Sequence, residues 1–75
     1  MDIQVFIKNF SEQFDETAPE MILPETKFKE LDEWSSMTAL TIIAMVDEQY
    51  AKKLSGTDIK NANTVEDLYE LIKNK

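Results

Sequence analysis

The spacing of apolar and polar residues predicts that this chain is built from helices. Over residues 2–14, apolar side chains recur at the three- and four-residue intervals that place them on one face of an amphipathic helix. No segment alternates apolar and polar residues in the way that a half-buried strand does. An all-α fold is therefore expected, and its first helix should face the core with Ile3, Phe6, Ile7, Phe10 and Phe14.

The helical spacing disappears between about Asp15 and Ser35. Pro19 and Pro24 interrupt this segment, and its many acidic residues favour exposure to solvent. An irregular segment of roughly twenty residues is unusual in a compact domain unless it is anchored. We therefore expect an ordered crossover between two helices, anchored by Ile22, Leu23, Phe28, Leu31 and Trp34.

A second long helix is expected to start at Ser35-Ser36 and to run to about Tyr50. Serine is a favourable N-cap, and Lys52 and Lys53 suit the negative end of the helix dipole. At about 100° per residue, this helix has two apolar stripes rather than one. One stripe comprises Ala39, Ile42, Ile43, Val46 and Tyr50, and the other comprises Met37, Leu40 and Ala44.

Two interpretations of the second stripe are open at this point. In one, the helix lies centrally and is covered on both sides. In the other, Met37, Leu40 and Ala44 stay partly exposed to receive a partner. A surface helix needs only one apolar stripe to contact its core, so the sequence does not decide between these arrangements.

Capping signatures predict a short helix and a final helix. Ser55-Gly56-Thr57-Asp58 opens a helical turn that extends to Asn61, and Thr64-Val65-Glu66-Asp67 opens the final helix. The final helix is expected to turn Val65, Leu68, Leu71 and Ile72 inward. The expected fold is a small antiparallel bundle of three main helices plus one short helix, with a long loop after the first helix. The residues expected in the common core are Phe6, Phe10, Ile43, Val46, Leu68 and Ile72.

Length and charge narrow the possible functions. The 75 residues suffice for one domain, expected to span 1–75, and their formal net charge is −7. All eight cationic residues are lysines, which argues against nucleic acid or an anionic membrane as a partner and favours a basic protein surface. No segment approaches the roughly 18–20 apolar residues of a membrane span, and the first ten residues do not resemble a secretory signal. A cytoplasmic protein without membrane insertion is expected.

The chain contains no cysteine and no histidine. Disulfides, zinc sites with the usual ligands, and Cys-His or Ser-His catalysis are therefore excluded. No catalytic residue and no dedicated metal-ligand loop is visible. The clustered acids Glu30, Asp32 and Glu33 are the place where divalent cations could bind and stabilise the acidic chain.

Ser36 is the residue at which the sequence indicates a different kind of chemistry. A serine at a helix start most simply acts as an N-cap. As a nucleophile it would be weak, because no histidine or cysteine can activate it. The free N–H groups and the dipole at a helix N-terminus favour an anion by roughly 0.3–1 kcal/mol. A serine modified there by another enzyme, through a phosphate, is therefore physically reasonable.

Three segments resemble acyl carrier proteins. Residues 28–37, Phe-Lys-Glu-Leu-Asp-Glu-Trp-Ser-Ser-Met, are similar to the family's attachment segment, in which an Asp-Ser-Leu motif opens the second of four helices. Residues 42–50 resemble the hydrophobic helix that ends in paired acids and an aromatic residue. Ile59 and residues 63–68 resemble the short third helix and the Thr-Val start of the fourth. The resemblance covers essentially the whole chain in length, loop placement and order of elements.

This resemblance implies a carrier rather than an enzyme. Ser36 would receive a covalent 4′-phosphopantetheine arm from a phosphopantetheinyl transferase, and the thiol of the arm would hold acyl intermediates as thioesters. Acyl-loading and acyl-processing enzymes with basic docking patches would act on them in a specialised fatty-acid, polyketide or related biosynthetic pathway. The carrier is expected to be a monomer, and its partner-binding residues are expected to be Met37, Leu40, Asp47 and Glu48.

The attachment segment departs from the family pattern at several positions. Ser35 stands where the family has an aspartate. A serine can serve as the N-cap in place of aspartate, but it does not supply the negative charge. Thr38 and Thr41 occupy positions that are often acidic in the family. Ser35 is itself a rival attachment site, but Ser36 is favoured because a large apolar residue, Met37, follows it. The alternative function is an unmodified helical protein-interaction module with the same fold.

Overall fold

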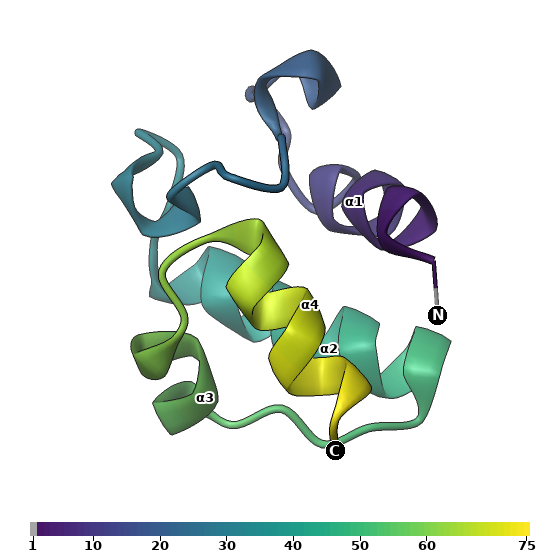
Figure 1. The fold of residues 1–75 in the computed structure, drawn as a ribbon. Coiled ribbons are helices and arrows are strands. Elements are labelled where there is room, and N and C mark those ends of the chain that lie inside the picture. Colours follow the sequence, from purple (N-terminus) through teal and green to yellow (C-terminus); the bar gives the residue numbers. More distant parts are fainter. Residues whose placement is uncertain (1) are drawn as a thin grey trace.

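The computed structural model describes residues 2–75, which form four α-helices and two short 3₁₀ turns (Figure 1). No strand occurs within these residues. The expected all-α fold of three longer helices and one short helix, with a long loop after the first, is confirmed. The helices are α1 (Ile3–Ser11), α2 (Ser36–Tyr50), α3 (Gly56–Asn61) and α4 (Val65–Lys73), and the turns η1 (Pro19–Met21) and η2 (Phe28–Glu30) lie in the crossover from α1 to α2.

The last two helices begin at the predicted capping signatures. Ser55 and Asp58 form a reciprocal capping box at α3, in which each side chain accepts a hydrogen bond from the backbone N–H of the other residue. Thr64 and Asp67 form the same arrangement at α4. Because each box pairs two N–H groups that the helix itself cannot pair, both helix starts are set locally.

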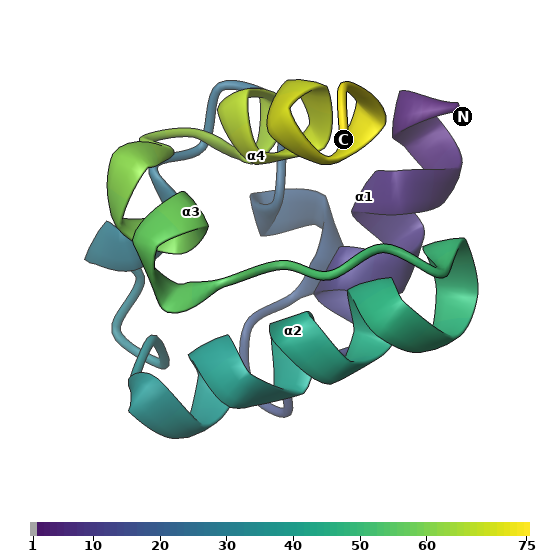
Figure 2. The ribbon, with the colours of Figure 1, turned by 90° about the horizontal axis from the view of Figure 1, so that it is seen from below.

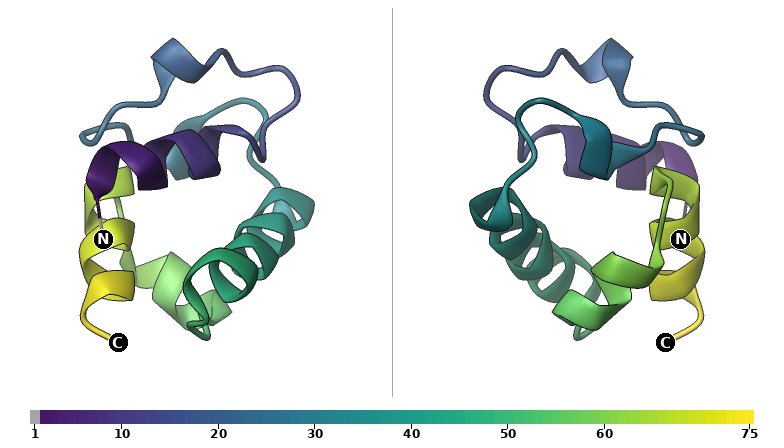
Figure 3. Two further views of the ribbon diagram at one scale, coloured as in Figure 1. Left: turned by 90° about the vertical axis from the view of Figure 1, so that its right-hand side faces the viewer. Right: turned by 90° about the vertical axis from the view of Figure 1, so that its left-hand side faces the viewer.

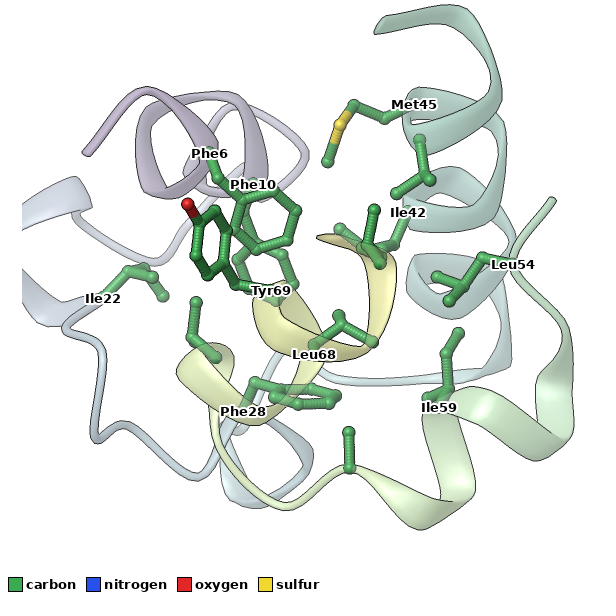
Figure 4. Packing of buried hydrophobic residues seen from close by; sticks show 14 of the residues in the cluster. Phe6, Phe10, Ile22, Phe28, Ile42, Met45, Leu54, Ile59, Leu68 and Tyr69 are labelled. Atoms are coloured by element: carbon green, nitrogen blue, oxygen red, sulfur yellow. The ribbon is translucent and has the colours of Figure 1, made fainter. Parts of the chain in front are cut away.

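A single hydrophobic core fills the space enclosed by the helices. Figure 2 shows α2 and α4 on opposite sides of the molecule, with α1 and α3 at its two ends. The rings of Phe6, Phe10 and Tyr69 gather in the middle, with Phe6 centroids 5.9 Å from Phe10 and 5.7 Å from Tyr69, and Ile42 and Met45 of α2 point toward them (Figure 4). Five of the six predicted core residues are completely buried, namely Phe6, Phe10, Val46, Leu68 and Ile72.

The prediction is wrong for the sixth core residue, Ile43, because helix α2 is rotated about its axis relative to the expected orientation. Ile43 is only partly buried, whereas its neighbour Ile42 is completely buried and Met45 is nearly so. Helix α2 therefore turns Ile42, Met45 and Val46 toward the core and leaves Ile43 at the edge. Two adjacent isoleucines in one stripe fit either rotation equally well, so periodicity alone could not choose between them.

The crossover is anchored as expected, except at one residue. Ile22 and Phe28 are buried, and Leu31 and Trp34 pack partly buried against the core. Leu23, by contrast, is 47% exposed. It begins a tight turn that is closed by a 3.0 Å hydrogen bond to its carbonyl oxygen from the N–H of residue 26, and this turn leaves the side chain outside.

Polar contacts tie the crossover to the second half of the chain. The N–H groups of Val65 and Glu66, at the start of α4, donate to the carbonyl oxygens of Thr26 and Pro24 at 3.1 and 2.9 Å. The Lys29 ammonium donates to the carbonyl oxygens of residues 59 and 60 at the end of α3, at 3.1 and 2.8 Å. Figure 3 shows the crossover arching over the outer side of α1 on its way to α2. The long segment is thus an ordered part of the domain.

Within residues 2–75, every helix is too short or too polar to cross a bilayer.

Candidate functional site

The start of α2 is capped by Ser35, which leaves the hydroxyl of Ser36 free. Ser35 has an extended backbone (φ −156°, ψ 175°), and its Oγ accepts a hydrogen bond from the N–H of Thr38 at 3.3 Å. Ser36 is the first helical residue, is exposed, and makes no side-chain hydrogen bond within residues 2–75. Capping therefore belongs to Ser35, and the Ser36 hydroxyl is available for chemistry.

The chain immediately before Ser36 is held by the core. The Trp34 ring packs edge-on against Phe28, with centroids 5.0 Å apart, and lies 6.4 Å from the ring of Phe14. The hydroxyl of Thr38 donates to the carbonyl oxygen of Glu33 at 3.1 Å, which joins the first helical turn to the residues that lead into it. Ser36 is thus presented from a fixed backbone.

Glu33 fixes the other side of this junction. Its carboxylate accepts hydrogen bonds from the backbone N–H groups of residues 15–17, at the start of the crossover, and from the Thr17 hydroxyl at 2.9 Å. Desolvation acts to raise the pKa of Glu33, but these hydrogen bonds stabilise the charged form and the net shift of the pKa is downward. The side chain therefore connects the start of the crossover to the residues that lead into α2.

The role of Glu33 was not foreseen from the sequence. The sequence places it in a cluster with Glu30 and Asp32 where divalent cations could bind, but within residues 2–75 no group of three carboxylates is arranged to hold a metal ion. Backbone donors already engage the Glu33 carboxylate, so these three acids do not form a dedicated metal site. These donors lie 16–18 residues away in sequence, so no local motif could have indicated them.

The second apolar stripe of α2 is exposed. Met37 is 73% exposed, Leu40 is 63% exposed, and Ala44 also faces solvent. The sequence left open whether α2 is covered on both sides. In the isolated chain it is not, because no other part of residues 2–75 covers the second stripe. Ser36 lies at the edge of this outward face, one residue before Met37 and one helical turn before Leu40.

The expected acidic contacts lie at the far end of the same helix. Asp47 and Glu48 are exposed in its last turns, about 18 Å from Ser36 at the helical rise. The Asp47 carboxylate forms an ion pair with Lys53 at 3.2 Å, whereas Glu48 forms no ion pair within residues 2–75. The outward face of α2 is therefore apolar and uncharged near Ser36 and acidic only at its end.

A phosphate-linked group on Ser36 fits this environment. The first N–H groups of α2, those of Ser36 and Met37, precede the helical hydrogen-bond ladder and have no partner within residues 2–75, so they can donate to a phosphodiester on the neighbouring oxygen. No acidic side chain belongs to the first turn of the helix. A bound anion would therefore meet backbone donors and the positive end of the helix dipole, with no acid in that turn to repel it.

Comparison with known proteins identifies such a group. The family model described as "phosphopantetheine attachment site" matches residues 4–72, from the first turn of α1 to the last turn of α4. A search of curated proteins and a search of solved structures returned no match. The matched range contains the whole junction described above.

Proposed function

The chain belongs to the phosphopantetheine attachment-site family, whose members carry covalent 4′-phosphopantetheine, and we propose that Ser36 is the residue that carries it here. The observation that carries this assignment is that the two adjacent serines at the start of α2 have different roles. Ser35 caps the helix, and Ser36 presents a free, exposed hydroxyl beside unpaired N–H groups.

The chain itself acts as a carrier. The bound arm supplies a thiol, on which acyl intermediates are held as thioesters, and this explains how a chain without cysteine can take part in sulfur chemistry. The residues of the chain hold the arm, orient it and present it to enzymes. A reducing compartment such as the cytoplasm suits a free thiol, and a monomer leaves the face of α2 open to partners.

We propose that partners dock on the outward face of α2. These are a phosphopantetheinyl transferase and the acyl-loading and acyl-processing enzymes of a specialised fatty-acid, polyketide or related pathway. Met37 and Leu40 would provide an apolar contact next to the arm, and Asp47 and Glu48 would meet basic residues. The first turn lacks an acid, which favours a dedicated transferase that does not need one there.

The test is modification by a phosphopantetheinyl transferase with coenzyme A, followed by the mass of the intact protein. Wild type and Ser35→Ala are expected to gain one phosphopantetheine group, and Ser36→Ala is expected to gain none. Ser35→Asp is expected to improve modification by a general-purpose transferase. Circular dichroism serves as the control, because Ser36→Ala keeps the Ser35 cap and should remain fully helical.

Two outcomes would contradict the proposal. Modification that persists in Ser36→Ala and disappears in Ser35→Ala would move the arm to Ser35. A wild-type chain that stays unmodified by its cognate transferase would favour the alternative of an unmodified interaction module, which would use the same exposed stripe of α2.

A further inference from the structure

The negative charge of this chain is concentrated on the crossover rather than on α2. Residues 12–33 contain eight carboxylates and two lysines, a net charge of −6 out of −7 for the whole chain. Helix α2 contributes only Asp47 and Glu48, and Lys52 and Lys53 follow shortly after the end of the helix. The attraction of a basic partner at long range is therefore directed mainly at the crossover.

The crossover also contains a groove. It has a volume of about 500 Å³ and lies where the segment after α1 passes the segment that leads into α2. Its apolar lining is Ala18, Met21 and Leu31, and its acidic lining is Glu16, Asp32 and Glu33. Met21 is 60% exposed, so its side chain is accessible to a partner at this groove.

The acids of this groove have different duties. The Glu33 carboxylate is engaged by the backbone of residues 15–17, which braces the groove in its present shape. The side chains of Glu16 and Asp32 make no hydrogen bond or ion pair within residues 2–75. The groove therefore combines two unpaired carboxylates, those of Glu16 and Asp32, with an apolar floor, and the Glu33 hydrogen bonds hold its shape.

We propose that this groove docks a basic, amphipathic segment of a partner protein. The apolar face of that segment covers Met21 and Leu31, and an Arg or Lys side chain at the edge of this face turns its cation toward Glu16 and Asp32. This surface goes beyond the proposed function, because it is independent of which serine carries the arm and uses no residue of the outward face of α2.

The test is a titration of the ¹⁵N-labelled full chain, followed by NMR, with two short synthetic peptides. One peptide carries arginines and has leucines along one helical face, and the other has the same arginines with serine in place of leucine. The leucine peptide should shift the signals of residues 16–21 and 31–33 most. It should also bind several-fold more tightly than the serine peptide, because only the leucine peptide covers the apolar floor.

Matched variants separate the groove from general charge attraction. Glu16→Gln/Asp32→Asn should weaken binding of the leucine peptide by roughly fivefold, as expected when two exposed ion pairs are lost. Glu25→Gln/Glu66→Gln removes the same charge outside the groove and should weaken it by less than about twofold. Met21→Ser should reduce binding of the leucine peptide and leave the serine peptide unchanged.

Equal losses in the two double variants, or signal changes centred on Met37 and Leu40 rather than on the groove, would overturn the proposal. The variants should remain folded, because neither Glu16 nor Asp32 supports the loop through its side chain. The backbone NMR spectrum of each variant without peptide checks this. Neither result depends on pantetheinylation. The groove proposal can therefore be refuted while the assignment of Ser36 stands, and the assignment of Ser36 can be refuted while the groove proposal stands.

Discussion

Helix α4 follows the rules of helix stability closely, whereas α2, which packs on the same core, breaks several of them. Helix α4 has a reciprocal capping box, two acids in its first turn and Lys73 in its last. Helix α2 has a single N-cap hydrogen bond of 3.3 Å, no acid in its first turn and no base in its last. Its C-cap is Ala51, whose left-handed backbone (φ 55°) is strained for a residue other than glycine.

The outward faces of these two helices differ in the same sense. Helix α4 exposes charged residues and turns Val65, Leu68 and Ile72 completely inward. Helix α2 exposes Met37 and Leu40 and carries acids at the end where the helix dipole disfavours them. Local rules are commonly broken where a surface serves binding rather than stability. The comparison therefore favours α4 as support for the core and the face of α2 as the working surface.

The largest effect is expected from one substitution made on both helices. Leu68→Ala in α4 should lower the free energy of unfolding by about 2–5 kcal/mol, because Leu68 is completely buried. Leu40→Ala in α2 should change it by less than about 0.5 kcal/mol but weaken docking of the transferase. Urea denaturation and transferase kinetics measure the two quantities. A large loss of stability in Leu40→Ala would remove the distinction between the helices.

Acid should weaken the caps of α3 and α4 directly, whereas the Ser35 cap of α2 does not titrate and is affected only through Glu33 in the crossover. The pKa of Asp58 is lowered by the Lys75 ammonium and the Ser55 N–H, and that of Asp67 by the N–H groups of Thr64 and Asn63. Lowered folded-state pKa values mean that the stabilisation is fully present above the ordinary value of 3.8. It is lost as the pH falls through the folded-state values.

Denaturation curves at about pH 6 and about pH 3 measure this dependence. Asp67→Asn should show a smaller decrease in stability between the two than wild type does. The Glu33 carboxylate, whose pKa is also lowered, contributes in the same direction and makes the start of α2 sensitive to acid through the crossover. An unchanged pH dependence in Asp67→Asn would contradict a role for its charge in the α4 cap.

Glycine substitutions at two alanines of the α2 region should have opposite signs. Ala51→Gly should raise the free energy of unfolding by about 0.5–1 kcal/mol, because glycine adopts the left-handed conformation without strain. Ala44→Gly, in the exposed middle of the helix, should lower it by about 1 kcal/mol. Thermal denaturation of both variants checks the pair, and a loss of stability in Ala51→Gly would show that its strain is negligible.

The smallest effect is expected from charge reversal at the helix ends. Glu48→Lys, in the last turn of α2, should stabilise the chain by about 0.3–1 kcal/mol, and Glu66→Lys, in the first turn of α4, should destabilise it by a similar amount. Glu48→Lys should also slow association with a basic partner more than it speeds dissociation. Stopped-flow binding and urea denaturation supply the measurements. A faster association in Glu48→Lys would contradict the expected role of Glu48 in docking.

The sequence predicted those parts of the molecule that depend on neighbouring residues. The start of α2 and both capping boxes are local features, and each lies where its signature indicated. The rotation of α2 about its axis was missed at Ile43 because it depends on packing against distant residues. The bracing of the crossover by Glu33 was missed for the same reason.

At the candidate site too, the sequence indicated local features but not those that depend on packing against distant residues. That Ser35 rather than Ser36 forms the cap could be anticipated only as a possibility, since two adjacent serines offer the same hydroxyl. The exposure of Met37 and Leu40 could not be predicted, because periodicity counts apolar stripes but does not say which of them the rest of the chain covers. The family match supports the kind of prosthetic group, and the choice of serine is left to the modification experiment.

The packing of Trp34 gives the chain a natural optical reporter. It is the only tryptophan, it lies two residues before Ser36, and its indole contacts the rings of Phe28 and Phe14. Its fluorescence therefore originates entirely from the junction between the crossover and α2. Loading of the arm or arrival of a partner can be followed in the unlabelled protein as a change in the intensity or wavelength of that emission.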